Sequence, residues 1–121
     1  LLVNAVNVVG PEGVIEVAES ATETTMRIVQ MIERDRQKLH QIGRGSATAI
    51  RVHEFVVRYV VMSVPRTASS LELSEPAVYA AVARLEEAGI LREITGRRRG
   101  RLYAYDEYLA VLNEGTTDPV P

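Results

Sequence analysis

The part of the sequence that most constrains the fold is residues 67–88, which predict two helices joined by a very short turn. Residues 67–71 favour a short helix, and Ser74 is the residue type that caps the start of a following one. That second helix is predicted over 75–88, with Pro76 in its first turn, where a missing N–H costs nothing. A short helix, a tight junction and a longer helix are what a helix-turn-helix requires.

A β-hairpin is predicted directly after the second helix. Gly89 suits the left-handed residue that ends a helix. Residues 90–94 then alternate in polarity like a strand, 95–100 form a turn, and 101–105 make the return strand. We therefore expect a mainly α (α+β) chain whose residues 46–115 form a winged helix-turn-helix domain, with this two-stranded hairpin as its wing.

A long amphipathic helix, predicted over residues 14–42, precedes that domain. Apolar residues recur on it at helical spacing, and acidic residues lead while basic residues follow, which suits the helix macrodipole. Ser46 is expected to cap a further helix over 47–63, which Val64-Pro65 ends. The apolar stripe of the long helix is expected to pack on the winged domain, on a second copy of itself, or on a domain outside this chain.

The two ends of the chain carry less information. Residues 1–13 are expected to form an irregular lead, apolar at first but without the basic start of a signal peptide. A last helix is predicted over 107–113, capped by Asp106 and ended by Gly115. Residues 116–121 are polar and contain proline, so we expect a disordered tail.

Composition narrows the function classes. The chain has no cysteine, which excludes disulfides and thiolate metal sites and favours the cytoplasm. No run of about 18 apolar residues occurs, so no membrane contact is expected. Neither His40 nor His53 has partners at metal spacing, and we expect one in solvent and one at a helix surface. With no nucleophile elbow, phosphate loop or zinc-protease motif, we expect no cofactor, metal or catalytic residue, and no enzyme.

The strongest functional signal is a cluster of four arginines at the tip of the predicted wing: Arg97, Arg98, Arg99 and Arg101. Guanidinium groups crowded on a small loop repel one another unless an anion is near, and DNA phosphates are the natural partner of a wing. The alternatives are a soluble turn whose charges bind nothing, or another anionic partner. The net charge of −2 means that only this local patch favours DNA.

The predicted recognition helix offers few groups that can read bases. Its residues expected to face the major groove are Ser74, Ala77, Tyr79, Ala80 and Arg84, of which only Arg84 is a strong donor. Neighbouring glutamates would repel phosphate, so a surface of this kind suits a protein partner equally well. The expected DNA binding is therefore dominated by phosphate contacts and steep in salt.

Three tyrosines near the end of the hairpin are expected to pack the wing on the core, with their polar tips in water: Tyr103, Tyr105 and Tyr108. The alternative is a platform on which bases stack.

Several segments of the sequence, taken in order, resemble the C-terminal region of bacterial Fic (filamentation induced by cAMP) proteins. They are residues 12–18, residues 33–36, residues 85–99 and residues 105–109. The resemblance extends from about Pro11 to Gly115, although winged transcription regulators share the Leu-Glu-Glu-Ala-Gly element that begins at Leu85.

Membership of the Fic family would imply an upstream catalytic domain that transfers AMP to protein hydroxyls (AMPylation). The family motif His-Pro-Phe-x-Asp/Glu-Gly-Asn-Gly-Arg does not occur here, and neither histidine precedes a proline, so no catalytic residue carries over. The family's inhibitory pattern, Ser/Thr-x-x-x-Glu-Gly/Asn, is also absent, since Ala110 stands four residues before Glu114. The catalytic domain would then be missing from this chain.

The sequence thus predicts a non-catalytic DNA-binding and regulatory module of a Fic-like protein, acting in transcription regulation. A homodimer through the long helix is expected, because paired half-sites are the usual route to DNA affinity. The alternative is a protein-interaction or dimerisation module that presents substrates to the catalytic domain or regulates it.

Overall fold

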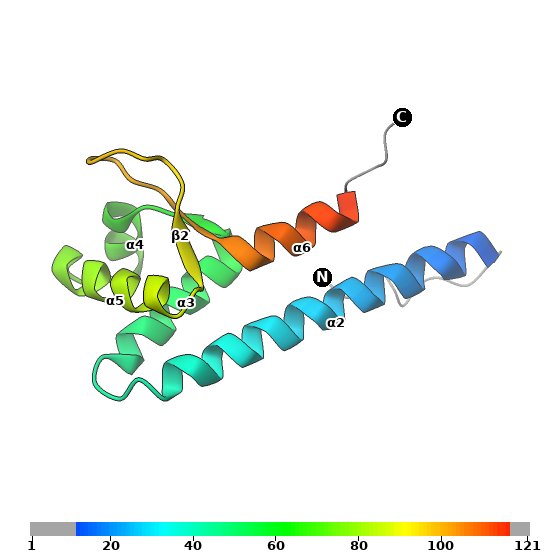
Figure 1. Cartoon of the computed structure of the whole chain (residues 1–121), viewed down its shortest axis with the longest axis horizontal. Coiled ribbons are helices and arrows are strands. Elements are labelled where there is room, and N and C mark those ends of the chain that lie inside the picture. Colours follow the sequence, from blue (N-terminus) through cyan, green and yellow to red (C-terminus); the bar gives the residue numbers. More distant parts are fainter. Residues whose placement is uncertain (1–11, 117–121) are drawn as a thin grey trace.

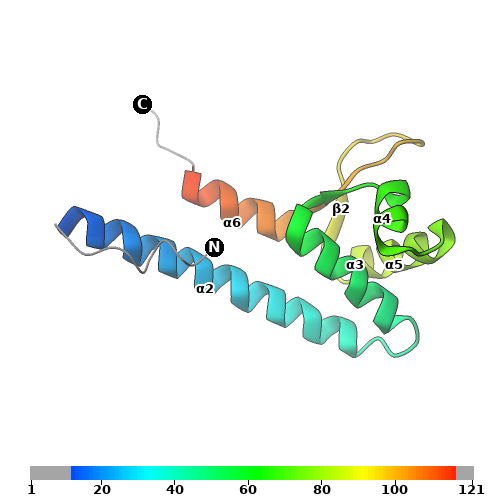
Figure 2. The ribbon, with the colours of Figure 1, turned by 180° about the vertical axis from the view of Figure 1, so that it is seen from behind.

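A helix of 29 residues, α2 (Glu12–His40), lies along one side of the molecule (Figures 1 and 2). The structure is a computed structural model that describes residues 12–116, with side chains from 22 to 114. The helix begins and ends two residues earlier than predicted, so Glu12 and Gly13 belong to it rather than to the irregular lead. The rest of the lead, residues 1–11, lies outside the described residues.

The second helix, α3 (Ser46–Tyr59), is shorter than the sequence predicted. Its cap is Gly45, in the left-handed conformation, so the prediction that Ser46 caps it is wrong. The helix ends at Tyr59 rather than residue 63 because Val60 adopts a positive φ of 69° and redirects the chain. A short apolar run is compatible with either a helix or a strand, and here it continues as strand β1 (Val61–Met62).

The next two helices form the tight pair that the sequence predicted. Helix α4 (Val64–Leu71) starts three residues earlier than expected, with Pro65 in its first turn, where proline begins a helix instead of stopping one. Glu72, with a φ of 57°, turns the chain within three residues into α5 (Glu75–Glu87).

The predicted cap at the start of α5 and the left-handed glycine after its end are both confirmed. The Ser74 hydroxyl accepts a 3.2 Å hydrogen bond from the amide of Ala77 at the start of the helix. Gly89 adopts a φ of 78° just after its end. Helix α5 is one residue shorter than expected, because Ala88 is its cap.

A small antiparallel sheet with strand order β1-β3-β2 completes the domain. Strand β2 (Leu91–Glu93) pairs with β3 (Tyr103–Tyr105), and β1 lies on the other side of β3, with Met62 opposite Tyr103. The predicted hairpin is confirmed as β2 and β3, but the sheet has three strands rather than two, because β1 adds a strand from a distant part of the sequence. The two hairpin strands are also shorter than predicted.

The last helix, α6 (Asp106–Thr116), lies beside α2 (Figures 1 and 2). Asp106 is its first residue rather than its cap, and the helix continues past the predicted end at 113 and through Gly115. Thr116, expected in the tail, belongs to the helix, and residues 117–121 lie outside the described residues.

The core lies between α3, α5, the sheet and the C-terminal half of α2. Fully buried apolar side chains on α3 and α5 face one another, and α2 adds Ile28, Met31 and Leu39 to the same cluster. Three partners were considered for the long helix, and later elements of this chain, α3 and α6 among them, cover the C-terminal half of its apolar stripe. Within residues 12–116 no helix combines the length and the apolar character needed to cross a membrane.

Candidate nucleic-acid interface

The loop that joins β2 to β3, residues 94–102, projects away from the body of the molecule (Figure 1). Its base is held by Glu93, whose carboxylate accepts 2.8 Å hydrogen bonds from the backbone amides of Thr95 and Gly96. The Thr95 hydroxyl donates to the same carboxylate and is the main reason why the pKa of Glu93 is lowered. The loop thus leaves the sheet in a defined direction.

All four arginines of this loop are exposed, and we refer to Arg97, Arg98, Arg99 and Arg101 as the arginine cluster. Arg101 is oriented within the loop, because its Nε donates to the carbonyl oxygen of Arg97. Within residues 22–114, Arg97, Arg98 and Arg99 form no ion pair with a carboxylate. Other arginines do, such as Arg27 with Glu114 at 2.6 Å and Arg92 with Asp106 at 2.9 Å. Arg97, Arg98 and Arg99 therefore carry positive charge that no carboxylate pairs within residues 22–114, whereas the Arg101 charge contributes to the lowered pKa of Glu93.

The outer face of α5 carries mostly small side chains and little positive charge that would attract DNA. Ser74 and Ala80 are exposed and Ala77 is half-buried, while the Tyr79 side chain is 54 % exposed. The Ser74 hydroxyl already serves as the cap of the helix. Tyr79 and Arg84, five residues apart, lie on opposite flanks of the helix, because each residue advances by about 100°.

Arg84 lies against the turn between α2 and α3. A Cβ atom on Gly45 would stand 2.8 Å from the Arg84 Nε, so the guanidinium covers this glycine closely. The side chain is half-buried there. Arg84, the one strong hydrogen-bond donor predicted on α5, thus packs against the α2–α3 turn. It lies at the opposite end of α5 from Ser74.

A buried cluster of hydrogen-bonded polar side chains was not predicted from the sequence. Asp35, His53 and Tyr105 are each at most 1 % exposed, and they come from α2, α3 and β3. The Tyr105 hydroxyl donates to Asp35 Oδ2 at 2.6 Å, and His53 Nε2 lies 3.1 Å from the same hydroxyl. The sequence signal is the position of Asp35 on the apolar stripe of α2, between Met31 and Leu39.

Two predictions about these side chains are wrong. His53 is not at a helix surface, and the polar tip of Tyr105 is not in water, because both point into the interface between α2 and the sheet. Tyr103 and Tyr108 are also buried, as expected for residues that pack the hairpin on the core, and His40 is exposed.

The hydrogen positions in this buried group follow from its chemistry. The Tyr105 hydroxyl has one proton, which it donates to Asp35, so its oxygen accepts from the Nε2–H of a neutral His53. Burial lowers the pKa of His53 and raises the pKa of the Tyr105 hydroxyl, so both groups are held neutral. The Asp35 carboxylate also accepts from Arg34 at 2.9 Å.

The part of the chain with described side chains contains no group of three or more His, Asp or Glu residues placed to hold a metal ion. No protein-family model matches this chain, and no curated protein matches it. The resemblance to the Fic family therefore stays a prediction.

Proposed function

We propose that residues 46–115 form a winged helix-turn-helix domain that binds DNA, and that the arginine cluster is its main contact. The chain is then a non-catalytic regulatory module, and the resemblance given above makes a Fic-like protein its parent. The observation that carries this proposal is the exposed positive charge of Arg97, Arg98 and Arg99, which form no ion pair within residues 22–114.

The order of elements supports the domain type. Helices α4 and α5 are joined by three residues, as in a helix-turn-helix, and α3 packs behind α5. The β2–β3 hairpin is the next element after α5, and its loop stands at the same end of the molecule as α4 (Figure 1). This is the relative order of a recognition helix and its wing.

The charges support phosphate contacts rather than base reading. Arg97, Arg98 and Arg99 each offer a planar set of donors that matches phosphate oxygens. The exposed side of α5 carries alanines and the glutamates Glu86 and Glu87, which favour neither phosphates nor base edges. Binding of modest sequence specificity and strong salt dependence follows.

The test is fluorescence anisotropy of the chain with random-sequence duplex DNA between about 50 and 200 mM salt. The variant changes Arg97, Arg98 and Arg99 together to Ala. Losing three phosphate contacts lowers the salt slope of log K by up to about 3. The matched control changes Arg27, Arg36 and Arg44 to Ala, which removes the same charge away from the loop.

The proposal holds if the loop variant loses affinity and slope and the control keeps both. It fails if wild-type protein does not bind at the lowest salt, or if both variants weaken binding equally. In the second case the effect is one of net charge and not of the loop.

A second candidate function, dimerisation through α2, rests on a different observation. Met26 and Val29 on this helix are 54 % and 55 % exposed, although both are large and apolar. They lie one helical turn apart and therefore share a face of α2. Sedimentation of wild type beside a Met26→Glu/Val29→Glu variant tests this: a dimer that dissociates in the variant supports it, and a monomeric wild type excludes it.

A further inference from the structure

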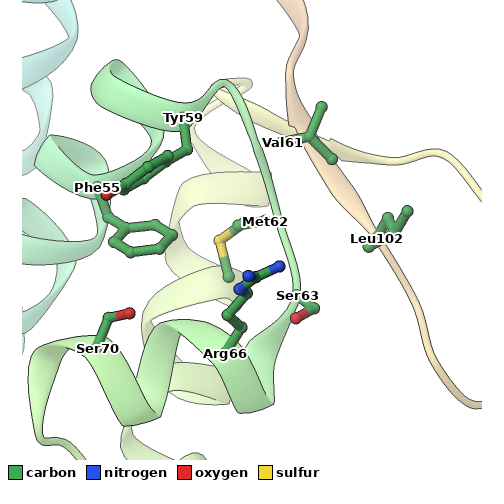
Figure 3. A pocket seen from close by; sticks show the side chains of 8 residues that line it. All are labelled: Phe55, Tyr59, Val61, Met62, Ser63, Arg66, Ser70 and Leu102. Atoms are coloured by element: carbon green, nitrogen blue, oxygen red, sulfur yellow. The ribbon is translucent and has the colours of Figure 1, made fainter.

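A pocket of about 490 Å³ lies between the C-terminal end of α3, strand β1 and helix α4 (Figure 3). This volume is within the range of small-molecule sites. The pocket is separate from the buried Asp35 group and from the arginine cluster, since it shares no residue with either.

One wall of the pocket is aromatic. Phe55 and Tyr59, one turn apart on α3, tilt at 45° to each other with ring centroids 4.7 Å apart. Tyr59 is 53 % exposed, and outside the pocket Arg58 lies 5.4 Å from the centre of its ring. Because part of this aromatic surface is exposed to water, a flat apolar ligand can pack against it.

The remaining apolar surface comes from the sheet. Val61 and Met62 on β1 and Leu102, which follows Arg101 in the β2–β3 loop, line the side that faces the aromatic wall (Figure 3). Met62 is buried, and its flexible thioether side chain adapts to the edge of a ring.

A single charged group points into this apolar space. Arg66, in the second position after Val64 at the start of α4, is exposed and lines the pocket, and Figure 3 shows its head group directed toward the gap between α3 and the sheet. Within residues 22–114 it has neither an ion pair nor a hydrogen bond. The hydroxyl groups of Ser63 and Ser70 lie on the same lining.

We propose that this pocket binds a small molecule made of a planar aromatic ring system and one carboxylate. The rings lie against Phe55, Tyr59 and Met62, and the carboxylate accepts paired hydrogen bonds from the Arg66 guanidinium. A carboxylate fits better than a phosphate, because one guanidinium matches one negative charge and no second cationic side chain lines the described pocket.

The serines complete the polar end of the site. Either hydroxyl can donate to the lone pairs of the carboxylate that Arg66 leaves free. A ligand held there contacts α4 on one side and Leu102, at the stem of the β2–β3 loop, on the other.

The proposal is tested with naphthoate as the probe and the corresponding uncharged alcohol as its partner. Isothermal titration calorimetry gives the affinities of both compounds for the whole chain, and amide chemical shifts by NMR locate them. The variants are Arg66→Gln, which keeps a polar side chain without charge, and Arg44→Gln, which removes an exposed arginine on the α2–α3 turn.

Naphthoate is expected to shift amides of residues around Tyr59, Met62 and Arg66. Arg66→Gln should weaken naphthoate binding at least about tenfold, the usual effect of losing a charged hydrogen bond, and Arg44→Gln should not. The alcohol should bind more weakly than naphthoate and be insensitive to Arg66→Gln.

Three results would overturn the proposal. They are no binding of naphthoate at millimolar concentration, shifts centred elsewhere on the molecule, and equal naphthoate affinities for Arg66→Gln and Arg44→Gln. Because the assay contains no DNA, these outcomes are independent of whether the arginine cluster binds DNA.

Discussion

The hydroxyl of Tyr105 donates a 2.6 Å hydrogen bond to the carboxylate of Asp35, although 70 residues separate the two in the sequence. Tyr105 belongs to β3, where it pairs with Leu91 of β2, and Asp35 belongs to α2. The bond therefore links the long helix directly to the sheet from which the β2–β3 loop projects. Both groups are buried, and Asp35 Oδ2 depends on the Tyr105 hydroxyl for its hydrogen bond, whereas Oδ1 accepts from Arg34.

Replacing Tyr105 with Phe should destabilise the protein by about 1–3 kcal/mol. The substitution keeps the ring and its packing but leaves the buried Asp35 carboxylate and the Nε2–H of His53 without their common partner. The free energy of unfolding, measured by urea denaturation at neutral pH, gives the size of the loss.

The control for this experiment is Tyr108→Phe. Tyr108 is also buried and meets the Tyr105 ring edge-on, with centroids 5.6 Å apart, but its hydroxyl makes no hydrogen bond within residues 22–114. Removing the Tyr108 hydroxyl should therefore lower the free energy of unfolding much less than removing the Tyr105 hydroxyl. Equal costs for the two substitutions would mean that the hydroxyl of Tyr105 contributes nothing specific.

The stability of the protein should fall as the pH drops below about 6.5. Burial lowers the pKa of His53 from its usual value of 6.5, so the unfolded chain takes up a proton there before the folded protein does. Stability from this histidine is complete above the unfolded pKa and is lost as the pH falls toward the folded one. One proton gives a slope of at most about 1.4 kcal/mol per pH unit.

The measurement is the free energy of unfolding against pH for wild type, His53→Gln and His40→Gln. Gln at position 53 cannot be protonated, so that part of the slope should disappear, and His40→Gln is the matched histidine substitution at an exposed position. If His53→Gln retains the wild-type slope between about pH 5 and 6.5, another group is responsible.

Local signals made the helical part of the fold predictable. Ser74 caps α5 and Gly89 follows its end as expected, because capping depends on residues within one turn of each other. Strand β1 was not predictable in this way: Val61 and Met62 pair with Ala104 and Tyr103, and a helical pattern continued through them in the sequence.

The candidate site residues and the buried polar residues differ in the same way. The exposed arginine cluster lies within residues 97–101 and is visible in the sequence, whereas Asp35, His53 and Tyr105 come together only when three elements pack. An acidic residue on an apolar stripe shows that a buried partner is needed, but it does not identify the partner. The pocket beside Arg66 likewise depends on the unpredicted strand.

Replacing Ser74 with Ala should lower stability by about 1 kcal/mol, because the amide of Ala77 loses its hydrogen-bond acceptor. Ser74→Asp should keep most of the stability, since a carboxylate caps equally well and favours the positive end of the helix. The matched control is Ser69→Ala on α4, where the exposed serine caps nothing. Thermal denaturation of the three variants distinguishes a capping role from a mere effect of removing a hydroxyl.

The two left-handed glycines of the α2–α3 turn allow the Arg84 contact to be measured. Gly43 and Gly45 have φ values of 86° and 85°, so a Cβ at either position should cost about 1–2 kcal/mol of backbone strain. At Gly43 the space is open, whereas at Gly45 the new atom would stand 2.8 Å from the Arg84 Nε. Because that group ends a flexible side chain, it should move away, and Gly45→Ala should exceed Gly43→Ala by less than about 1 kcal/mol.

Making Gly43→Ala and Gly45→Ala in an Arg84→Ala background completes a double-mutant cycle for the contact between Arg84 and Gly45. Without the guanidinium, Gly45→Ala and Gly43→Ala should cost the same free energy of unfolding, because only the backbone strain is left. If Gly45→Ala is still the more costly of the two, the glycine is required by the geometry of the turn itself. Arg84 would then be free to leave this position at little cost and to face solvent or a partner.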